Sequence, residues 1–191
     1  MLKKRTLITY LFVVFAWTLP IQAQHIALNN NLLFDAAGAL SAGVEISLTP
    51  SASLEAYGSI RPWKRSEESV HKHWLVQAQY RVWPCQVMNG WFFGPYVHAG
   101  EFNLGNHDLC LGLLNGLKPD RYEGWLAGAG IGAGYEYALA KHWNIGAEIG
   151  LGYTYIDYGR YECQRCGVEK ENDVFHYVGP SRLGVSISYV W

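Results

Sequence analysis

The chain has 191 residues, of which half are apolar, 15 % are aromatic and only 16 % are charged. Because soluble domains average about a quarter charged residues, this composition excludes intrinsic disorder, a coiled coil and a helical bundle. The formal net charge is −1 and the sequence contains no basic run that could follow a phosphate backbone, so we expect no nucleic-acid partner.

The N-terminal segment 1–23 has the organisation of a secretory signal peptide. Basic residues 3–5 precede an apolar stretch over 7–19, which is shorter than the roughly 20 apolar residues that a membrane-spanning helix needs. We expect cleavage after Ala23 and a mature domain over 24–191. Export brings cysteines into an oxidising compartment, where disulfides can form.

Apolar residues alternate with small or polar residues along most of the mature chain, which is typical of β-strands with one apolar face. The end of the chain shows the alternation clearly, because Leu183, Val185 and Ile187 are separated by Gly184 and Ser186. The eight predicted strands cover 26–34, 43–49, 53–61, 73–83, 91–100, 122–137, 142–157 and 176–191.

The connections between these strands alternate between short turns and longer loops, as the periplasmic turns and outer loops of outer-membrane barrels do. Aromatic residues, which favour membrane interfaces, gather near both ends of the strands. Near the turns lie Trp83, Trp91, Tyr135, Tyr137, Trp143, Tyr189 and Trp191. Near the loops lie Trp74, Tyr122, Trp125, Tyr153, Tyr155 and Tyr177.

These features predict an all-β fold, an eight-stranded antiparallel up-and-down transmembrane β-barrel. The expected location is the bacterial outer membrane, with outer-membrane lipid around the barrel. The alternative is a secreted sandwich or lipocalin-like barrel, whose apolar face would point inward.

The other face of the predicted strands carries charged residues that the barrel would enclose. An eight-stranded barrel is just wide enough for side chains to fill, so we expect no open diffusion pore. Buried charges are costly unless they are paired, which predicts a structural network; a proton or ion path through Glu136 or Glu148 is the alternative. The predicted interior polar network is Glu45, Glu55, Arg81, Glu136, Glu148 and Arg182, with Gln77, Gln79 and His98 on the same face. Asn30 breaks the alternation, since it is expected to face lipid.

Cys163 and Cys166 have a Cys-x-x-Cys spacing in the last predicted outer loop, which fits a loop disulfide, a redox pair or half of a zinc site. His107 and Cys110 would supply the two further ligands of a tetrahedral zinc site. The simpler hypothesis is that Cys163 pairs with Cys166, or that Cys110 pairs with one of them. Cys85 lies in a predicted periplasmic turn and is not expected to pair with the others. We expect no resident metal and no cofactor.

Histidines and hydroxyl residues occur near the predicted outer rim, but no spacing among them indicates a catalytic triad. A nucleophile needs a base within hydrogen-bond reach, and we assign no catalytic residue. A rim-located lipid-modifying or metal-dependent hydrolase is the alternative function, and a small channel is a third.

Short segments spread over 26–191 resemble one family in the same order. They are 31–35 (Asn-Leu-Leu-Phe-Asp), 61–64 (Arg-Pro-Trp-Lys), 73–77 (His-Trp-Leu-Val-Gln), 89–94 (Asn-Gly-Trp-Phe-Phe-Gly), 121–125 (Arg-Tyr-Glu-Gly-Trp), 163–167 (Cys-Gln-Arg-Cys-Gly) and 179–180 (Gly-Pro). The chain thus resembles the domain of unknown function 3575 family, found in Gram-negative anaerobes of gut and mouth. The resemblance implies an uncharacterised outer-membrane β-barrel, often encoded near fimbrial genes, and brings no catalytic residues.

The function we expect is that of a non-enzymatic integral outer-membrane barrel with a structural or surface-assembly role. Its outer loops would contact an envelope or fimbrial protein. The residues expected to form this contact surface are Trp63, Lys64, Arg65, Tyr122, Glu123 and Tyr161.

Overall fold

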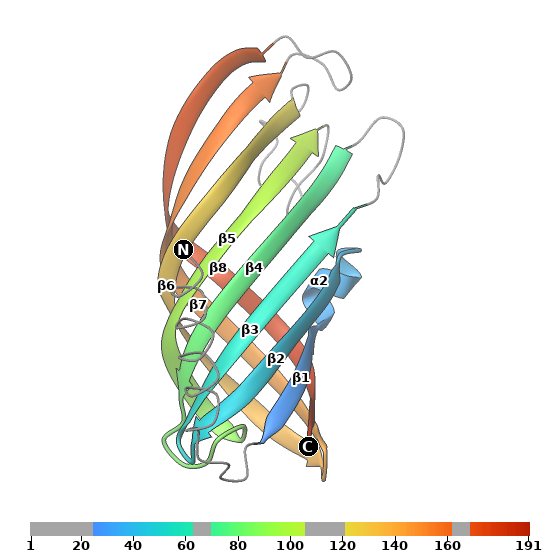
Figure 1. Cartoon of the computed structure of the whole chain (residues 1–191), viewed down its shortest axis with the longest axis vertical. Coiled ribbons are helices and arrows are strands. Elements are labelled where there is room, and N and C mark those ends of the chain that lie inside the picture. Colours follow the sequence, from blue (N-terminus) through green and yellow to red (C-terminus); the bar gives the residue numbers. More distant parts are fainter. Residues whose placement is uncertain (1–24, 63–69, 106–120, 162–168) are drawn as a thin grey trace, which may run out of the picture.

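A computed structural model describes residues 25–62, 70–105, 121–161 and 169–191. The strands are β1 (Ile26–Asn31), β2 (Leu40–Thr49), β3 (Ala52–Arg61), β4 (Val70–Val82), β5 (Gly90–Gly105), β6 (Arg121–Ala140), β7 (Trp143–Tyr161) and β8 (Glu169–Val190), with one short helix, α2 (Leu32–Ala36). Each strand pairs antiparallel with the next, and β1 pairs with β8, which closes the sheet into a ring (Figure 1). The predicted all-β, eight-stranded antiparallel fold is confirmed. The predicted signal peptide 1–23 lies outside the described residues.

The strand ends differ from the prediction in two ways. The first strand stops at Asn31 instead of continuing to residue 34, because the Asn31 side chain accepts a hydrogen bond from the Leu33 N–H (3.0 Å) and caps α2. β2 begins at Leu40, three residues before its predicted start, and the strands from β4 to β8 are longer than predicted and extend into the segments expected to be loops. In those segments polar residues occur on both faces, so the apolar–polar alternation used for the prediction ends. The strands continue because their pairing depends on backbone hydrogen bonds and not on the polarity of the side chains.

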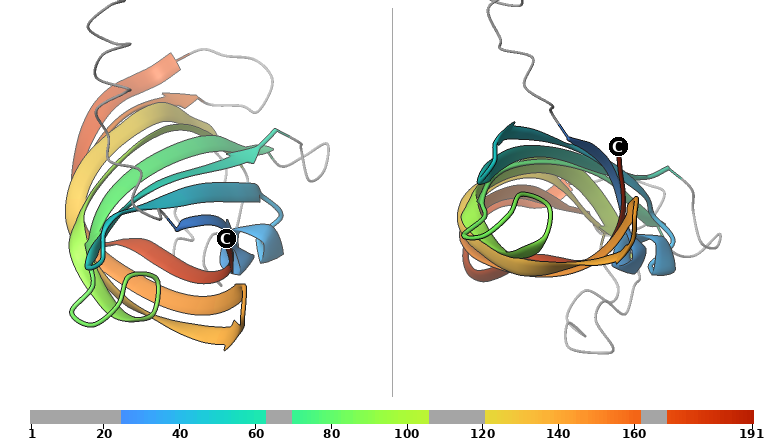
Figure 2. Two further views of the ribbon diagram at one scale, coloured as in Figure 1. Left: turned by 60° about the horizontal axis from the view of Figure 1, so that its bottom comes forward. Right: turned by 90° about the horizontal axis from the view of Figure 1, so that it is seen from below.

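The ring is much taller on one side than on the other (Figure 1). The strands β6, β7 and β8 have 20, 19 and 22 residues, whereas β1 has 6 and β2 and β3 have 10 each. The upper parts of β6, β7 and β8 therefore form a raised, curved wall, which is visible in Figure 1 and in the left view of Figure 2. No helix in the described ranges is long and apolar enough to cross a membrane.

The two faces of the sheet have opposite chemistry. Side chains that point outward are mostly apolar and exposed, such as Val97 (57 %), Ile131 (68 %) and Leu183 (62 %). Side chains that point inward are mostly polar and buried, and they include Glu45, which has no exposed surface. The interior is therefore not the apolar core that a lipocalin-like barrel requires.

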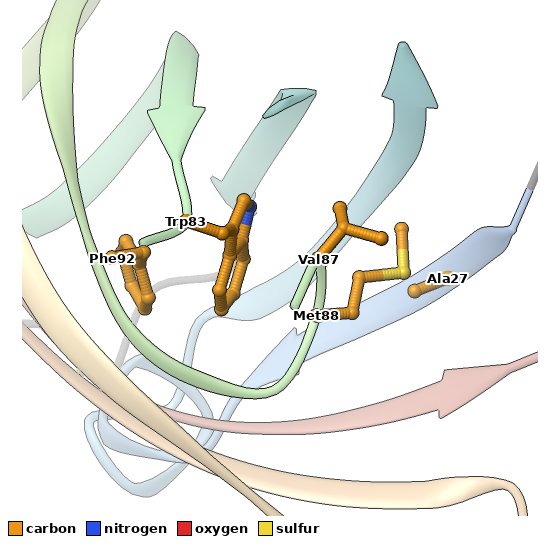
Figure 3. Close-up of a cluster of buried hydrophobic side chains, with 5 residues drawn as sticks. All are labelled: Ala27, Trp83, Val87, Met88 and Phe92. Atoms are coloured by element: carbon orange, nitrogen blue, oxygen red, sulfur yellow. The ribbon is translucent and has the colours of Figure 1, made fainter. Parts of the chain in front are cut away.

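A small apolar cluster closes the lower end of the ring. It contains Ala27, Trp83, Val87, Met88 and Phe92 (Figure 3). The connection between β4 and β5 supplies three of these side chains and lies across the ring when the molecule is seen from below (Figure 2). The prediction that Trp83 belongs to the aromatic girdle near the turns was wrong, because its side chain is fully buried inside this cluster.

The turn that carries this cluster is held in an uncommon backbone conformation. Met88 has a φ of 60° and Gly90 a φ of 96°. The left-handed region costs a residue with a side chain roughly 1–2 kcal/mol, and Asn144 holds it by donating a hydrogen bond to the Met88 carbonyl oxygen (2.7 Å). The turn is thus fixed across the end of the ring by a side chain of β7.

Candidate functional site

The guanidinium of Arg81 lies at the centre of the interior and contacts carboxylates from four strands. Its Nη1 lies 2.5 Å from Glu45 Oε2 and 3.4 Å from Glu136 Oε1. Its Nη2 lies 2.9 Å from Glu55 Oε2 and 3.1 Å from Glu148 Oε2. The Arg81 side chain is only 4 % exposed, so these ion pairs form away from bulk water.

A second arginine, Arg182 of β8, shares two of these carboxylates. It forms an ion pair with Glu55, and its Nε lies 3.0 Å from Glu148 Oε1. Its Nη1 donates a hydrogen bond to Gln77 Oε1 (3.2 Å). The structure therefore brings all six residues of the expected interior network into contact with one another through two guanidiniums.

Neutral donors complete the network; the sequence prediction placed Gln79 on the inward face but did not name Asn29 or Ser53. Asn29 Nδ2 donates to Glu55 (2.9 Å), Ser53 Oγ to Glu45 (2.5 Å) and Gln79 Nε2 to Glu148 (2.6 Å). They lie on the inward side of their strands, so their parity could have identified them. Four carboxylates face two guanidiniums here, and such donors stabilise the surplus negative charge.

The network lies directly on the apolar cluster that closes the lower end. The Arg81 guanidinium lies 4.4 Å from the centre of the Phe92 ring, and Trp83 Nε1 donates to Ser53 Oγ (2.8 Å). Beside Arg182, the cavity at the seam between β1 and β8 has a volume of about 70 Å³, which suits a few water molecules and no larger ligand. The ion-pair network and the apolar cluster thus link the strands inside the lower end of the ring.

Glycines on β6 and β7 make room for the large interior side chains. A Cβ atom at Gly132 would lie 2.6 Å from Glu148 Oε1 and 2.7 Å from Gln79 Nε2. At Gly130 it would lie 2.6 Å from the Tyr96 hydroxyl oxygen. This stripe of small residues is therefore required by the polar network opposite it.

We expect Gly132→Leu to lower the stability of the folded chain by about 1–3 kcal/mol or more, as overpacking does. The matched control is Gly58→Leu, because a Cβ at Gly58 has no neighbour closer than the Leu75 carbonyl oxygen at 3.8 Å. The measurement is the temperature at which the protein loses its folded mobility in a detergent gel. Equal effects of the two substitutions would contradict this role of Gly132.

The outer rim holds three of the six residues expected to form a contact surface. Tyr122 packs on Tyr158 with ring centres 5.7 Å apart. Arg121 forms an ion pair with Glu123 (3.1 Å) and lies 4.6 Å from the ring centre of Tyr161. The other three expected residues, Trp63, Lys64 and Arg65, lie outside the described residues. The described rim residues are thus near one another and engaged in contacts within β6 and between β6 and β7.

The expected metal and disulfide residues cannot be placed, because His107, Cys110, Cys163 and Cys166 all lie outside the described residues. Cys85 is exposed and forms no disulfide. Within the described ranges, no group of three His, Cys, Asp or Glu residues is arranged to hold a metal ion.

One serine and one histidine approach each other in the upper interior. Ser59 Oγ lies 3.3 Å from His73 Nε2. Ser59 is only 5 % exposed, so this pair offers a substrate no access to the hydroxyl. The other interior histidine, His98, contacts Thr154 Oγ1 (3.0 Å). These contacts build structure and show no nucleophile open to a substrate.

The structure explains why a polar residue, Asn30, occupies an outward position on β1. Its side chain is half-buried, and its Nδ2 donates to the backbone oxygen of Ser41 (2.9 Å) on β2. The amide is therefore satisfied by the neighbouring strand, which makes its position on the outer side acceptable.

Together, the closed antiparallel ring, its charged interior and its apolar exterior define a small β-barrel with a filled interior. The family model described as "Protein of unknown function (DUF3575)" matches residues 9–191, and the chain belongs to this family. The family resemblance drawn from the short motifs is therefore confirmed. No match was found among curated proteins.

Proposed function

We propose that the chain is an integral outer-membrane barrel, closed to solutes, that acts as a scaffold for an envelope or fimbrial protein at its outer rim. The observation that carries this proposal is the inverted polarity of the ring. Outward side chains between the aromatic residues at the two ends are uncharged, while the carboxylates and guanidiniums lie inside. Lipid is the surroundings in which that arrangement is favourable.

The spacing of outward aromatic residues supports the same proposal. Trp125 and Tyr135 on β6 are ten residues apart, as are Trp143 and Tyr153 on β7, and all four are exposed. Ten residues of strand span about 33 Å, which at a tilt of roughly 35–45° corresponds to about 25 Å of height, the thickness of the apolar band of such barrels. The outward charge of Glu123 lies two residues beyond Trp125 on the loop side, and Glu101 pairs directly with Trp125 at that edge of the band.

The filled interior favours a scaffold over a channel. The network around Arg81 and the cluster around Trp83 occupy the cross-section at the lower end. The rim at the opposite end carries the long connections and the raised wall of β5 to β8, where a partner could bind. The family resemblance, with its fimbrial gene neighbours, is the reason for proposing an envelope or fimbrial protein as this partner.

The first experiment compares the mobility of unheated and boiled outer-membrane protein in a detergent gel. A closed barrel migrates faster when unheated, so we expect a shift between the two samples and recovery of the chain in the outer-membrane fraction. Recovery from the soluble periplasm without a shift would overturn the membrane proposal. Loss of a tagged partner after rim substitutions such as Glu123→Ala would then test the scaffold role.

The orientation of the barrel gives a separate prediction that uses Cys85. This thiol is exposed in the connection between β4 and β5, at the end opposite the long connections. If the short turns face the periplasm, a maleimide on a polymer too large for porins should label Cys85 only after the outer membrane is permeabilised. The Cys85→Ser variant isolates this signal from the other cysteines. Equal Cys85-dependent labelling of intact cells would reverse the orientation.

A further inference from the structure

The ring is incomplete above its lower end, on the side where β8 meets β1. β1 pairs with β8 only as far as Asn31 opposite Ser186, and the chain then turns into α2. β8 itself continues upward to Glu169 and remains paired with β7 on its other side. Among the described residues, no strand pairs with β8 on this side above Ser186. Figure 1 shows the upper part of β8 as the outermost strand of the raised wall. We call this side of Asn172–Arg182 the free edge.

Hydrogen bonds at the lower end of β8 show the direction of its N–H groups. The Trp191 N–H donates to the Ile26 oxygen on the β1 side (3.0 Å), and the Val190 N–H donates to the His142 oxygen on the β7 side (2.8 Å). The N–H groups of successive residues thus alternate between the two neighbours. Those of residues with outward side chains, such as Trp191, point toward β1.

The same rule identifies the groups on the free edge. A bulge between Pro180 and Arg182 shifts the alternation by one residue. Above it, Val174, His176 and Val178 have outward side chains, so their N–H groups point to the free edge. Pro180 agrees with this assignment, because a proline fits on an edge strand when its nitrogen is on the unpaired side.

The side chain of Asp173 provides independent support. The Val174 N–H donates a hydrogen bond to Asp173 Oδ1 (2.7 Å). A carboxylate oxygen of the preceding residue thus takes the position that the carbonyl oxygen of a neighbouring strand would occupy. This local bond shows that the Val174 N–H is not used by β7 and is oriented toward a missing strand.

The sequence of the free edge favours strand pairing. Residues 174–178 read Val-Phe-His-Tyr-Val, a run without charge, glycine or proline and with high strand propensity. Both faces carry exposed apolar side chains, since Val178 is 79 % exposed and Phe175 is 53 % exposed, and His176 lies between the two valines on the outward face. An exposed apolar edge of this kind is a template for another strand.

We propose that the free edge of β8 binds an extended segment of a partner protein, which adds a ninth strand to the wall. This inference rests on the proposed function and deepens it by assigning the partner's binding mode. The chemistry of the occupant follows from the edge. Its backbone supplies the missing hydrogen bonds, as in other cases of strand addition, and it runs antiparallel to β8, like every pair in this sheet.

The side chains of the edge determine the composition of the segment. Opposite Val174 to Val178 it is apolar on both faces. Its C-terminal end reaches the upper part of β8, where Asp173 is exposed and Asp157 of β7 lies opposite Val174. We therefore expect lysine or arginine at that end of the partner segment.

The test uses the full chain, expressed in its own bacterium with a photo-crosslinking amino acid in place of Val174. Irradiation should give one adduct with a different protein, and the partner residues in it should map to one short segment with the composition given above. In the same background, Val178→Pro removes an N–H from the free edge and should lower the adduct yield about tenfold. Val178→Thr keeps the N–H and should leave the yield unchanged.

Two controls distinguish the edge from the rest of the barrel. The crosslinker at Ile131, an exposed outward position on a strand paired on both sides, should give no protein adduct. Tyr177→Pro removes an N–H directed at β7 and should abolish the heat-dependent gel shift, whereas Val178→Pro should retain it.

The outcomes separate this inference from the proposed function. A missing adduct, an adduct of two copies of this chain, or an adduct insensitive to Val178→Pro would overturn strand addition while the gel shift and outer-membrane location are retained. Loss of the gel shift and of the membrane location in the unsubstituted chain would instead overturn the proposed function itself.

Discussion

Replacing Arg81 by methionine is expected to destabilise the folded chain by about 3–5 kcal/mol, the cost of removing one partner from a buried ion pair. Methionine has a similar volume, so the loss comes from charge and hydrogen bonding. Without Arg81, the carboxylates of Glu45 and Glu136 have no arginine within ion-pair distance among the described residues. The measurement is the urea concentration at the midpoint of unfolding in detergent or in vesicles.

Two further variants test whether the loss of stability in Arg81→Met comes from the interior ion-pair network. Arg121→Met breaks the more exposed ion pair with Glu123 at the rim and should cost no more than about 1 kcal/mol. Glu136→Gln removes one carboxylate and should partly restore the stability of the Arg81→Met chain, because less unpaired negative charge remains. If the Arg81→Met chain were as stable as the Arg121→Met chain, the proposal that Arg81 stabilises the buried carboxylates would be contradicted.

The sequence predicts the inside and the outside of the ring because a strand alternates its side chains strictly. Glu45, Arg81 and Glu148 could be assigned to the interior from parity alone, since a shift of one residue would place each of them on the exposed apolar face. Which carboxylate contacts which guanidinium depends on register and on the tilt of the strands. Those quantities are set by the whole closed sheet and have no local signal in the sequence.

The parts that the sequence prediction missed have two causes. Trp83 continues the inward parity of Gln79 and Arg81 on β4, so alternation places its side chain inside the ring, where it is fully buried. Its assignment to the aromatic girdle followed from residue type and disregarded that parity. Asn31, in contrast, ends β1 through a side-chain cap, and the incomplete pairing of β8 follows from that early end. This second feature arises where the chain leaves regular pairing, so alternation carries no information about it.

The largest effect that depends on the surroundings of the barrel is expected for Ile131→Arg. Ile131 is 68 % exposed and lies about midway between Trp125 and Tyr135 on β6. On a protein surrounded by water, an exposed substitution of this kind changes stability by about 0.5 kcal/mol at most. In the middle of a bilayer, arginine on the outer face costs about 2–4 kcal/mol. The measurement is reversible folding into phospholipid vesicles, followed by urea titration.

Leu139→Arg is the matched control, because Leu139 lies near the lower end of the same strand and is 56 % exposed. Near an interface, arginine costs only about 0–1 kcal/mol, so the two variants should differ by several-fold in their effect on folding free energy. Both positions are exposed and apolar and lie on one strand, so a difference between the two arginine variants requires a lipid layer around Ile131. Equal and small effects at Ile131 and Leu139 would therefore contradict insertion of this face into a bilayer, even if the fold itself is retained.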